Sequence, residues 1–155
     1  MKKITTLVLA CSLAVSSSAM ADVAKSEKQA KRSVELRQAI FSLLGSNMGT
    51  LGAMAKGQIP VDAAVVEKNA TRINQLSLMI DDYTRVDTSG FDVKTEALDK
   101  VWTERSNFEK HIADFTTASI ALQKAAATGD EGTIKKAIGG VGKTCGGCHD
   151  IFKKD

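Results

Sequence analysis

The chain has little of what β-structure, a disulfide scaffold or nucleic-acid binding requires. Its 155 residues include one proline, Pro60, and no run of alternating β-branched residues, so we do not expect strands. Three cysteines are too few for a disulfide framework in a domain of this size. The formal net charge is only +3, and lysines and arginines are spread evenly, which excludes the basic patch of a nucleic-acid-binding protein. No apolar run reaches the roughly 20 residues that span a membrane.

The first 21 residues have the three-part pattern of a secretory signal peptide. Two lysines precede an apolar run, and small residues follow in an A-x-A pattern that ends at Ala21. We therefore expect a signal peptide over residues 1–21, cleavage after Ala21 and export to the periplasm. Residues 1–21 contain two lysines and no acidic residue, so the net charge of the mature chain falls from +3 to +1. Lipid attachment at Cys11 is an alternative, but the apolar run continues past this cysteine.

Residues 22–155 suit one domain with one core, and hydrophobic periodicity predicts an all-α fold. A polar connection without periodicity, residues 81–94, separates two pairs of amphipathic segments. Four helices with mostly short connections describe an antiparallel four-helix bundle. We predict the four helices at about 26–55 (with a capping box at Ser26 and Gln29), from Pro60 to about 80, from Thr95 to about 126, and from Asp130 onward.

The first predicted helix carries more apolar residues than one bundle core requires. They fall on two stripes, which predicts packing inside the bundle and against a partner chain. One stripe is Leu36, Ile40, Leu43, Leu51 and Met54, and the other is Val34, Phe41, Leu44 and Met48. Gly45, Gly49 and Gly52 form a face of small residues that permits close approach.

The last predicted helix places two cysteines on its apolar stripe. Apolar residues and cysteines recur there at spacings of three and four: Ile134, Ile138, Val141, Cys145, Cys148 and Phe152. Residues at these spacings lie on one face of a helix, so both cysteines face the bundle core. The group that they bind should therefore be large, apolar and internal.

Cys145, Cys148 and His149 form a C-x-x-C-H motif, which is the attachment motif of haem c. A disulfide between the two cysteines would be strained within a helix, and a thioredoxin-like motif would need a strand before the helix. Zinc would need four ligands, and the only other histidine is His111, which we expect to be solvated or hydrogen-bonded. We therefore predict haem c, with thioethers to both cysteines and His149 as an iron ligand.

At the level of whole segments the chain resembles cytochrome c′, the four-helix-bundle class with a C-terminal attachment motif. "ELRQAIFSLL" is similar to the first helix of that family, "KGQIPVDA" to the entry of the second, "VWTERSNF" to the third and "VGKTCGGCHDIF" to the fourth. The resemblance implies a haem in the bundle core with His149 as the single axial protein ligand. No methionine follows Met79, so a sixth ligand would have to come from the first two helices.

The resemblance also implies roles for residues outside the motif. Arg37 and Gln38 match a pair near the haem propionates, where a guanidinium can donate two parallel hydrogen bonds to a carboxylate. Phe41 matches an apolar residue over the distal face of the iron. Thr95 and Glu96 match a segment that borders the haem edge.

One position departs from the family pattern. Four residues after the haem histidine the family often has arginine, and this chain has Lys153. Lysine keeps the positive charge but lacks the planar fork of arginine, so a stacking or bidentate role is not expected.

A single axial ligand and an apolar distal side imply five-coordinate, high-spin iron that binds small diatomic molecules. Nitric oxide is the expected ligand, and carbon monoxide is a useful probe. The alternative is periplasmic electron transfer with redox partner proteins, which ligation of the iron by Met48 or Met54 would favour. No distal histidine–arginine pair is evident, so we do not expect an enzyme such as a peroxidase. The family is commonly an antiparallel homodimer through its first two helices, and we expect the same here.

Overall fold

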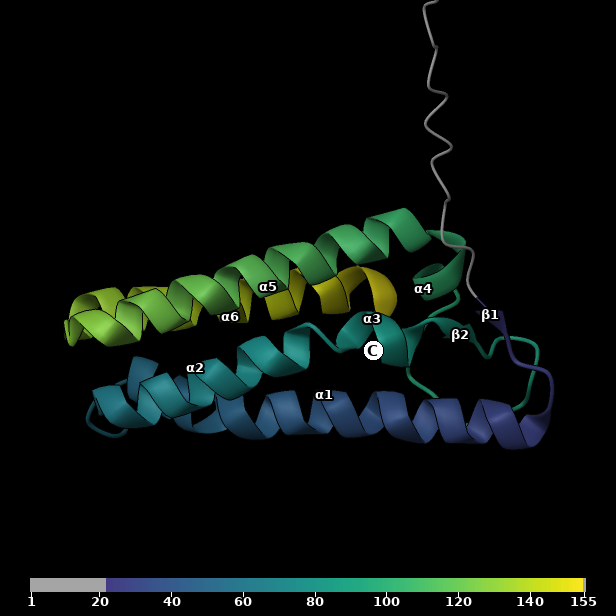
Figure 1. Cartoon of the computed structure of the whole chain (residues 1–155), viewed down its shortest axis with the longest axis horizontal. Helices are drawn as coiled ribbons and strands as arrows, with labels where there is room; N and C mark the ends of the chain where they lie inside the picture. Colours follow the sequence, from purple (N-terminus) through teal and green to yellow (C-terminus); the bar gives the residue numbers. More distant parts are fainter. Residues whose placement is uncertain (1–21, 155) are drawn as a thin grey trace, which may run out of the picture.

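The computed structural model describes residues 22–154, so the predicted signal peptide and Cys11 lie outside the described part. Four long helices form an antiparallel bundle, as the sequence predicts. Figure 1 shows them as two layers, with α1 and α2 on one side and α5 and α6 on the other. The four helices are α1 (Glu27–Ala55), α2 (Ala63–Ser77), α5 (Arg105–Thr128) and α6 (Glu131–Phe152).

Local capping chemistry explains where most of these helices begin and end. The Ser26 hydroxyl accepts a hydrogen bond from the Gln29 amide, and the Gln29 side chain accepts one from the Lys25 amide. The predicted capping box is therefore present, with its return bond one residue earlier than usual. Asp130 caps α6 through the Thr133 amide, as predicted, after Gly129 ends α5 with a φ of 68°.

The predicted start of the second helix is wrong by three residues. Pro60 precedes the helix, and α2 begins at Ala63. The Asp62 carboxylate accepts hydrogen bonds from the amides of Ala64 and Val65, so it supplies the N-cap. A side-chain cap, rather than the fixed φ of proline, therefore sets this helix end.

The long connection is more structured than the sequence predicts. It contains α3 (Ile80–Thr84), β2 (Val86–Asp87) and α4 (Lys100–Thr103), and the third long helix begins after α4 rather than at Thr95. The expectation of no strands is also wrong, because β2 pairs in parallel with β1 (Asp22–Val23). These short elements gather at one end of the bundle (Figure 1).

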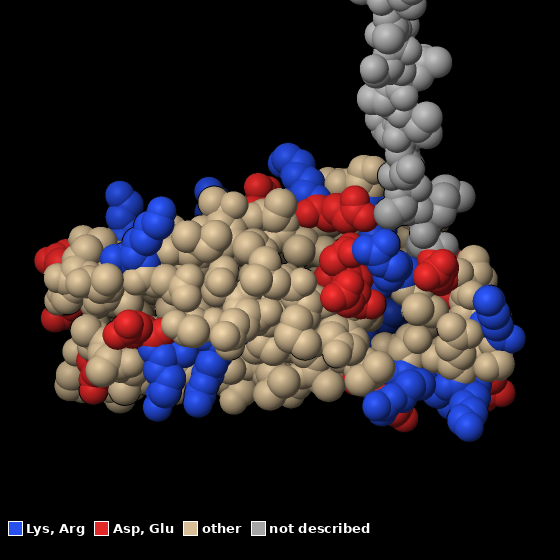
Figure 2. Space-filling view, in the orientation of Figure 1, with Lys and Arg blue, Asp and Glu red and all other residues tan. Residues whose placement is uncertain are grey.

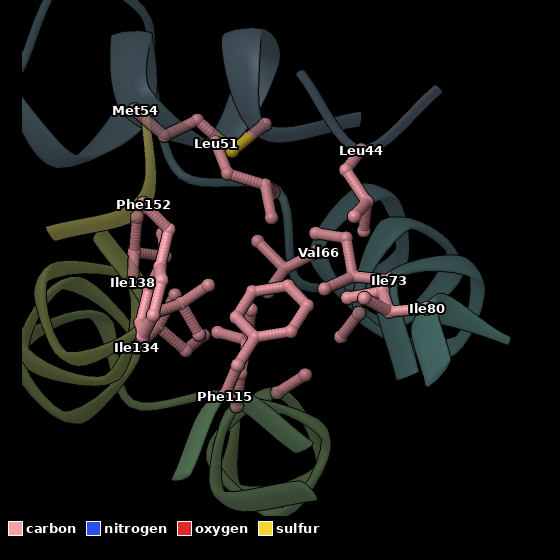
Figure 3. Close-up of a cluster of buried hydrophobic side chains, with 14 of the residues drawn as sticks. Leu44, Leu51, Met54, Val66, Ile73, Ile80, Phe115, Ile134, Ile138 and Phe152 are labelled. Carbon is pink, nitrogen blue, oxygen red and sulfur yellow. The ribbon is translucent and has the colours of Figure 1, made fainter. Parts of the chain in front are cut away.

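The core lies where all four long helices face inward. Figure 3 shows Leu44 and Leu51 of α1 converging with Phe115 of α5 and with apolar side chains of α2 and α6. The predicted division of α1 into two stripes is wrong, because the buried face combines Val34 and Leu44 of one stripe with Ile40 of the other. The face of α1 that is buried consists of Ala30, Val34, Arg37, Ile40, Leu44, Leu51 and Met54.

No helix in residues 22–154 combines the length and the hydropathy that a membrane crossing needs.

Candidate functional site

One cavity of about 550 Å³ lies among α1, α3, α5 and α6 and the segment before α4. It brings together every residue that the sequence assigns to the haem site. Those residues are Arg37, Gln38, Phe41, Thr95, Glu96, Cys145, Cys148 and His149. The predicted site residues, which are spread over the chain from α1 to α6, therefore share one space.

The two cysteines line this cavity from α6 and pack against the hydrophobic core. Both are half-buried free thiols. Burial raises the pKa of both thiols, and the neighbouring Cys145 helps to raise the pKa of Cys148 to about 11. His149 follows directly on α6, is exposed, and lines the same cavity.

Arg37 is the most deeply buried charged group of the site, with an exposure of 3%. Its Nη2 donates hydrogen bonds to the hydroxyls of Thr95 (2.9 Å) and Thr88 (3.4 Å). Its Nη1 is buried and has no hydrogen-bond partner. Burial lowers the pKa of Arg37, and the negative charge of Asp87 partly opposes this effect. A buried donor without a partner is costly, so this arrangement suits the binding of an anionic group.

A haem fits this site better than a bare metal ion does. The described residues contain no group of three or more histidine, cysteine or acidic side chains that could bind a metal ion. The cavity walls are instead mainly apolar and aromatic, with Phe108, Phe115 and Phe152 among the lining residues. An apolar ring that carries carboxylates would contact these walls and leave an acceptor for Arg37.

A short antiparallel bridge lines the cavity beside the haem-binding motif. Ala97 pairs with Lys153, and the Lys154 amide donates a hydrogen bond to the Glu96 carbonyl oxygen at 2.7 Å. Lys153 also lines the cavity, and its Nζ lies 3.1 Å from the Glu96 carboxylate. Thr95 and Glu96 therefore lie in the irregular segment just before this bridge and α4, and not at the start of the long helix as predicted.

The α1 side of the cavity is apolar. Phe41, Leu44 and Met48 line it, and Phe41 is 39% exposed. Met54 is buried in the core and does not line the cavity. Of the two methionines considered from the sequence, only Met48 is therefore close to the site.

Sequence reasoning missed two contributors and misjudged a third. Thr88 and Trp102 both contact Arg37 from the connection and α4, which local periodicity does not reveal. His111 is half-buried, lines the cavity and packs edge-on against Phe152 at 5.5 Å between ring centroids, so it is not simply a solvated histidine. Its place beside the apolar stripe of the third helix was the available signal.

Comparisons with known sequences agree with this geometry. A family model described as Cytochrome C′ matches residues 32–153. Cytochrome c′ of Rubrivivax gelatinosus is 36% identical over 122 residues, which cover 78% of this chain and 93% of the relative. Cytochrome c-554 of Cereibacter sphaeroides is 30% identical over 156 residues, and the match covers 99% of each chain.

Solved structures give the same result for the fold. Cytochrome c prime from Shewanella frigidimarina has a TM-score of 0.75 and 36% identity, and the match covers 84% of this chain and 100% of that one. A nitric oxide complex of a mutant of cytochrome c prime from Alcaligenes xylosoxidans has a TM-score of 0.73 and 28% identity. This second match covers 81% of this chain and 96% of that one.

Proposed function

The chain belongs to the cytochrome c′ family, and we propose that within this family it is a periplasmic protein that binds nitric oxide. The observation that carries the proposal is the shared cavity, which joins the C-x-x-C-H motif of α6 to the apolar face of α1. The nitric oxide complex of the Alcaligenes xylosoxidans relative supports the choice of ligand.

The cofactor is one haem c, attached through Cys145 and Cys148. When bound, it supplies the iron that binds a diatomic ligand, while the protein sets the axial ligand and the surroundings. His149 would bind the iron, because it directly follows the second cysteine and lines the same cavity.

In this proposal the remaining site residues orient the haem and shape its pocket. Arg37 would bind a haem carboxylate through its unpartnered Nη1, with Gln38 beside it. Thr95 accepts a hydrogen bond from Arg37, and Glu96 forms an ion pair with Lys153. These residues would hold the carboxylate side of the haem.

The apolar lining of α1 favours small neutral ligands. Phe41, Leu44 and Met48 offer no hydrogen-bond donor, so a polar oxygen adduct would gain no stabilisation from them. Phe41 also lines this side of the cavity, so its ring would restrict a ligand that binds there. Nitric oxide, which binds without help from a donor, is therefore the preferred ligand.

Titration of the reduced holoprotein with nitric oxide, carbon monoxide and oxygen tests this function. We expect tight nitric oxide binding, weaker carbon monoxide binding and no stable oxygen adduct, followed by visible absorption. Oxygen binding as tight as nitric oxide binding would contradict the proposal, because it would require a donor that the α1 lining does not supply.

Electron transfer is the second candidate, and the position of Met48 favours it. Met48 lines the cavity, and a methionine thioether is a haem ligand in several cytochromes. The distinguishing result is low-spin iron that becomes high-spin in Met48→Leu. Neither function requires substrate turnover, so we do not assign an enzymatic activity.

A periplasmic location requires that the chain be processed as its first residues predict. Asp22, the expected mature N-terminus, pairs with Val86 in the small sheet. N-terminal sequencing of the protein exported by a bacterial host should give Asp22. An N-terminus at Cys11 would instead support the lipid-attachment alternative.

A further inference from the structure

Arg37 is a buried cation for which the described residues supply no ion-pair partner. Its exposure is 3%, and its hydrogen-bond acceptors, Thr88 and Thr95, are neutral hydroxyls. An unpaired buried charge is strongly unfavourable unless its surroundings stabilise it. Something besides these two hydroxyls must therefore compensate the guanidinium and fix its plane.

Trp102 of α4 supplies an aromatic face for this purpose. The guanidinium carbon of Arg37 lies 5.2 Å from the centroid of the Trp102 ring, within the range of a cation–π interaction. The tryptophan is 7% exposed, so solvent screens the interaction little. Trp102 does not line the cavity, so it acts on a bound group only through Arg37.

The orientation of Trp102 is itself fixed by its neighbours. Its Nε1 donates a hydrogen bond to the Thr84 carbonyl oxygen at 3.0 Å, and Arg105 Nη1 donates to the same oxygen at 3.3 Å. Arg105 is also ion-paired with Asp81 of α3. Figure 2 shows acidic and basic side chains gathered over the α3 region of this face. The ring is therefore fixed from both α3 and α5.

We propose that Trp102 is the positioning residue for Arg37, holding the guanidinium so that Nη1 remains directed to a carboxylate of the haem. The inference rests on the proposed role of Arg37 at this carboxylate and identifies what makes that role possible. The hydroxyls of Thr88 and Thr95 accept the hydrogen bonds of Nη2, and the face of the Trp102 ring stabilises the positive charge. Nη1 is then the donor left for the ligand.

Other charged groups near the site remain the same when Trp102 is changed. Asp87 of β2 acts on Arg37 through its charge, and Glu96, Lys153 and His111 line the same cavity. Their contributions are common to the parent protein and its Trp102 variants. A difference between the parent protein and its fluorinated forms, which keep the indole N–H, therefore reports the π density of the ring.

Fluorinated tryptophan tests the proposal without changing the shape of the core. Trp102 is the only tryptophan of the chain, so biosynthetic incorporation alters this ring and no other. Each fluorine withdraws π density and weakens the cation–π interaction, while the indole N–H remains. The readout is the pH midpoint at which the visible spectrum of the ferric holoprotein reports ionisation of the haem carboxylate.

A well-placed Arg37 cation favours the ionised carboxylate and keeps its pKa low. We therefore expect the midpoint to rise stepwise with fluorination, by about 0.5–1 pH unit in total. Trp102→Leu should move it in the same direction. In an Arg37→Leu background, whose own midpoint is raised, fluorination should have no further effect.

Two results would overturn the inference while leaving the role of Arg37 intact. In the first, fluorination leaves the pH midpoint unchanged although Arg37→Leu raises it. In the second, fluorination shifts the midpoint equally in the parent protein and in Arg37→Leu. If Arg37→Leu itself leaves the midpoint unchanged, the proposed contact of Arg37 with the carboxylate fails, and the inference fails with it. Should Trp102→Leu not bind haem, the fluorinated proteins still decide the question.

Discussion

At the residue scale, the haem-binding chemistry depends on two thiols that are half-buried against the core. Burial raises the pKa of both thiols and so favours their protonated form in the folded chain without haem. We predict that Cys145→Ser/Cys148→Ser removes all covalent attachment, whereas each single variant keeps one thioether. Mass spectrometry of the denatured protein measures the attached haem directly.

The double variant should also be less stable than the parent protein. A ligand that binds only the native state adds stability, and weaker binding reduces that gain. The single variants are the matched controls, since each changes one thiol and retains covalent haem. Covalently bound haem in the double variant would show that the cofactor is attached elsewhere.

Phe41 provides a second test at this scale. If its ring restricts the α1 side of the haem, Phe41→Ala should bind carbon monoxide faster and more tightly. The variant should also unfold at a lower temperature. Its loss in free energy of unfolding should be smaller than the about 3–5 kcal/mol that truncation of a fully buried phenylalanine costs, because Phe41 is 39% exposed. Flash photolysis gives the kinetics, and thermal unfolding gives the stability.

Phe91→Ala is the control for this experiment. Phe91 is half-buried in the connection and does not line the cavity, so its truncation should leave ligand binding unchanged. Carbon monoxide kinetics in Phe41→Ala that match those of the parent protein would assign Phe41 to ordinary packing.

The sequence predicts much of the site at this scale because the haem motif is local. Cys145, Cys148 and His149 are fixed on one face of a helix by their spacing alone, and the structure places both cysteines against the core. Arg37 was assigned only through family resemblance. Arg37 lies on the same buried face of α1 as Val34, Ile40 and Leu44. A search for stripes of apolar residues does not find it, because its side chain is charged.

At the element scale, Asp130 makes the stability of the N-terminus of α6 depend on pH. Hydrogen bonds from the side chain and amide of Thr133 lower the pKa of this carboxylate. Its stabilisation is therefore complete above the pKa of the unfolded chain, near 4, and is lost as the pH falls through the lower folded-state pKa. We predict that Asp130→Ala lowers the thermal midpoint at pH 6 and that the difference shrinks below pH 4.

Asp130→Asn separates the cap from the charge. Asparagine still accepts a hydrogen bond from the Thr133 amide, so this variant should retain most of the stability without the pH dependence. A difference between Asp130→Ala and the parent protein that stays constant from pH 6 to pH 2 would contradict the role of the ionised cap.

Elements that depend on distant contacts could not be predicted from local pattern. The five residues of α3 are fixed by Arg105 and by the Trp102 hydrogen bond to Thr84, both from later in the chain. The short strands form only because residues 22–23 meet residues 86–87. The long helices, by contrast, have periodic apolar faces, which is why the bundle itself was predictable.

At the scale of the whole molecule, the surface of α1 predicts self-association. Leu43 is 54% exposed and does not line the haem cavity, and Gly49 and Gly52 leave open space for a neighbouring chain. We predict an antiparallel homodimer through α1 and α2, which Leu43→Glu should dissociate because it buries a charge in the interface. Sedimentation velocity at high micromolar concentration measures the state.

Ile120→Glu is the control for the dimer, since Ile120 is 40% exposed on α5, outside the predicted interface. It should leave the dimer intact. A parent protein that sediments only as a monomer at this concentration would remove the prediction.

The central claim is that one cavity presents a haem c with His149 as its only axial protein ligand. The visible absorption spectrum of the reduced holoprotein near neutral pH tests this claim most directly. The account predicts the broad bands of five-coordinate, high-spin iron, which sharpen to a low-spin spectrum only when carbon monoxide is added. Sharp low-spin bands in the protein without added ligand would contradict it, and their loss in Met48→Leu would identify Met48 as the second axial ligand.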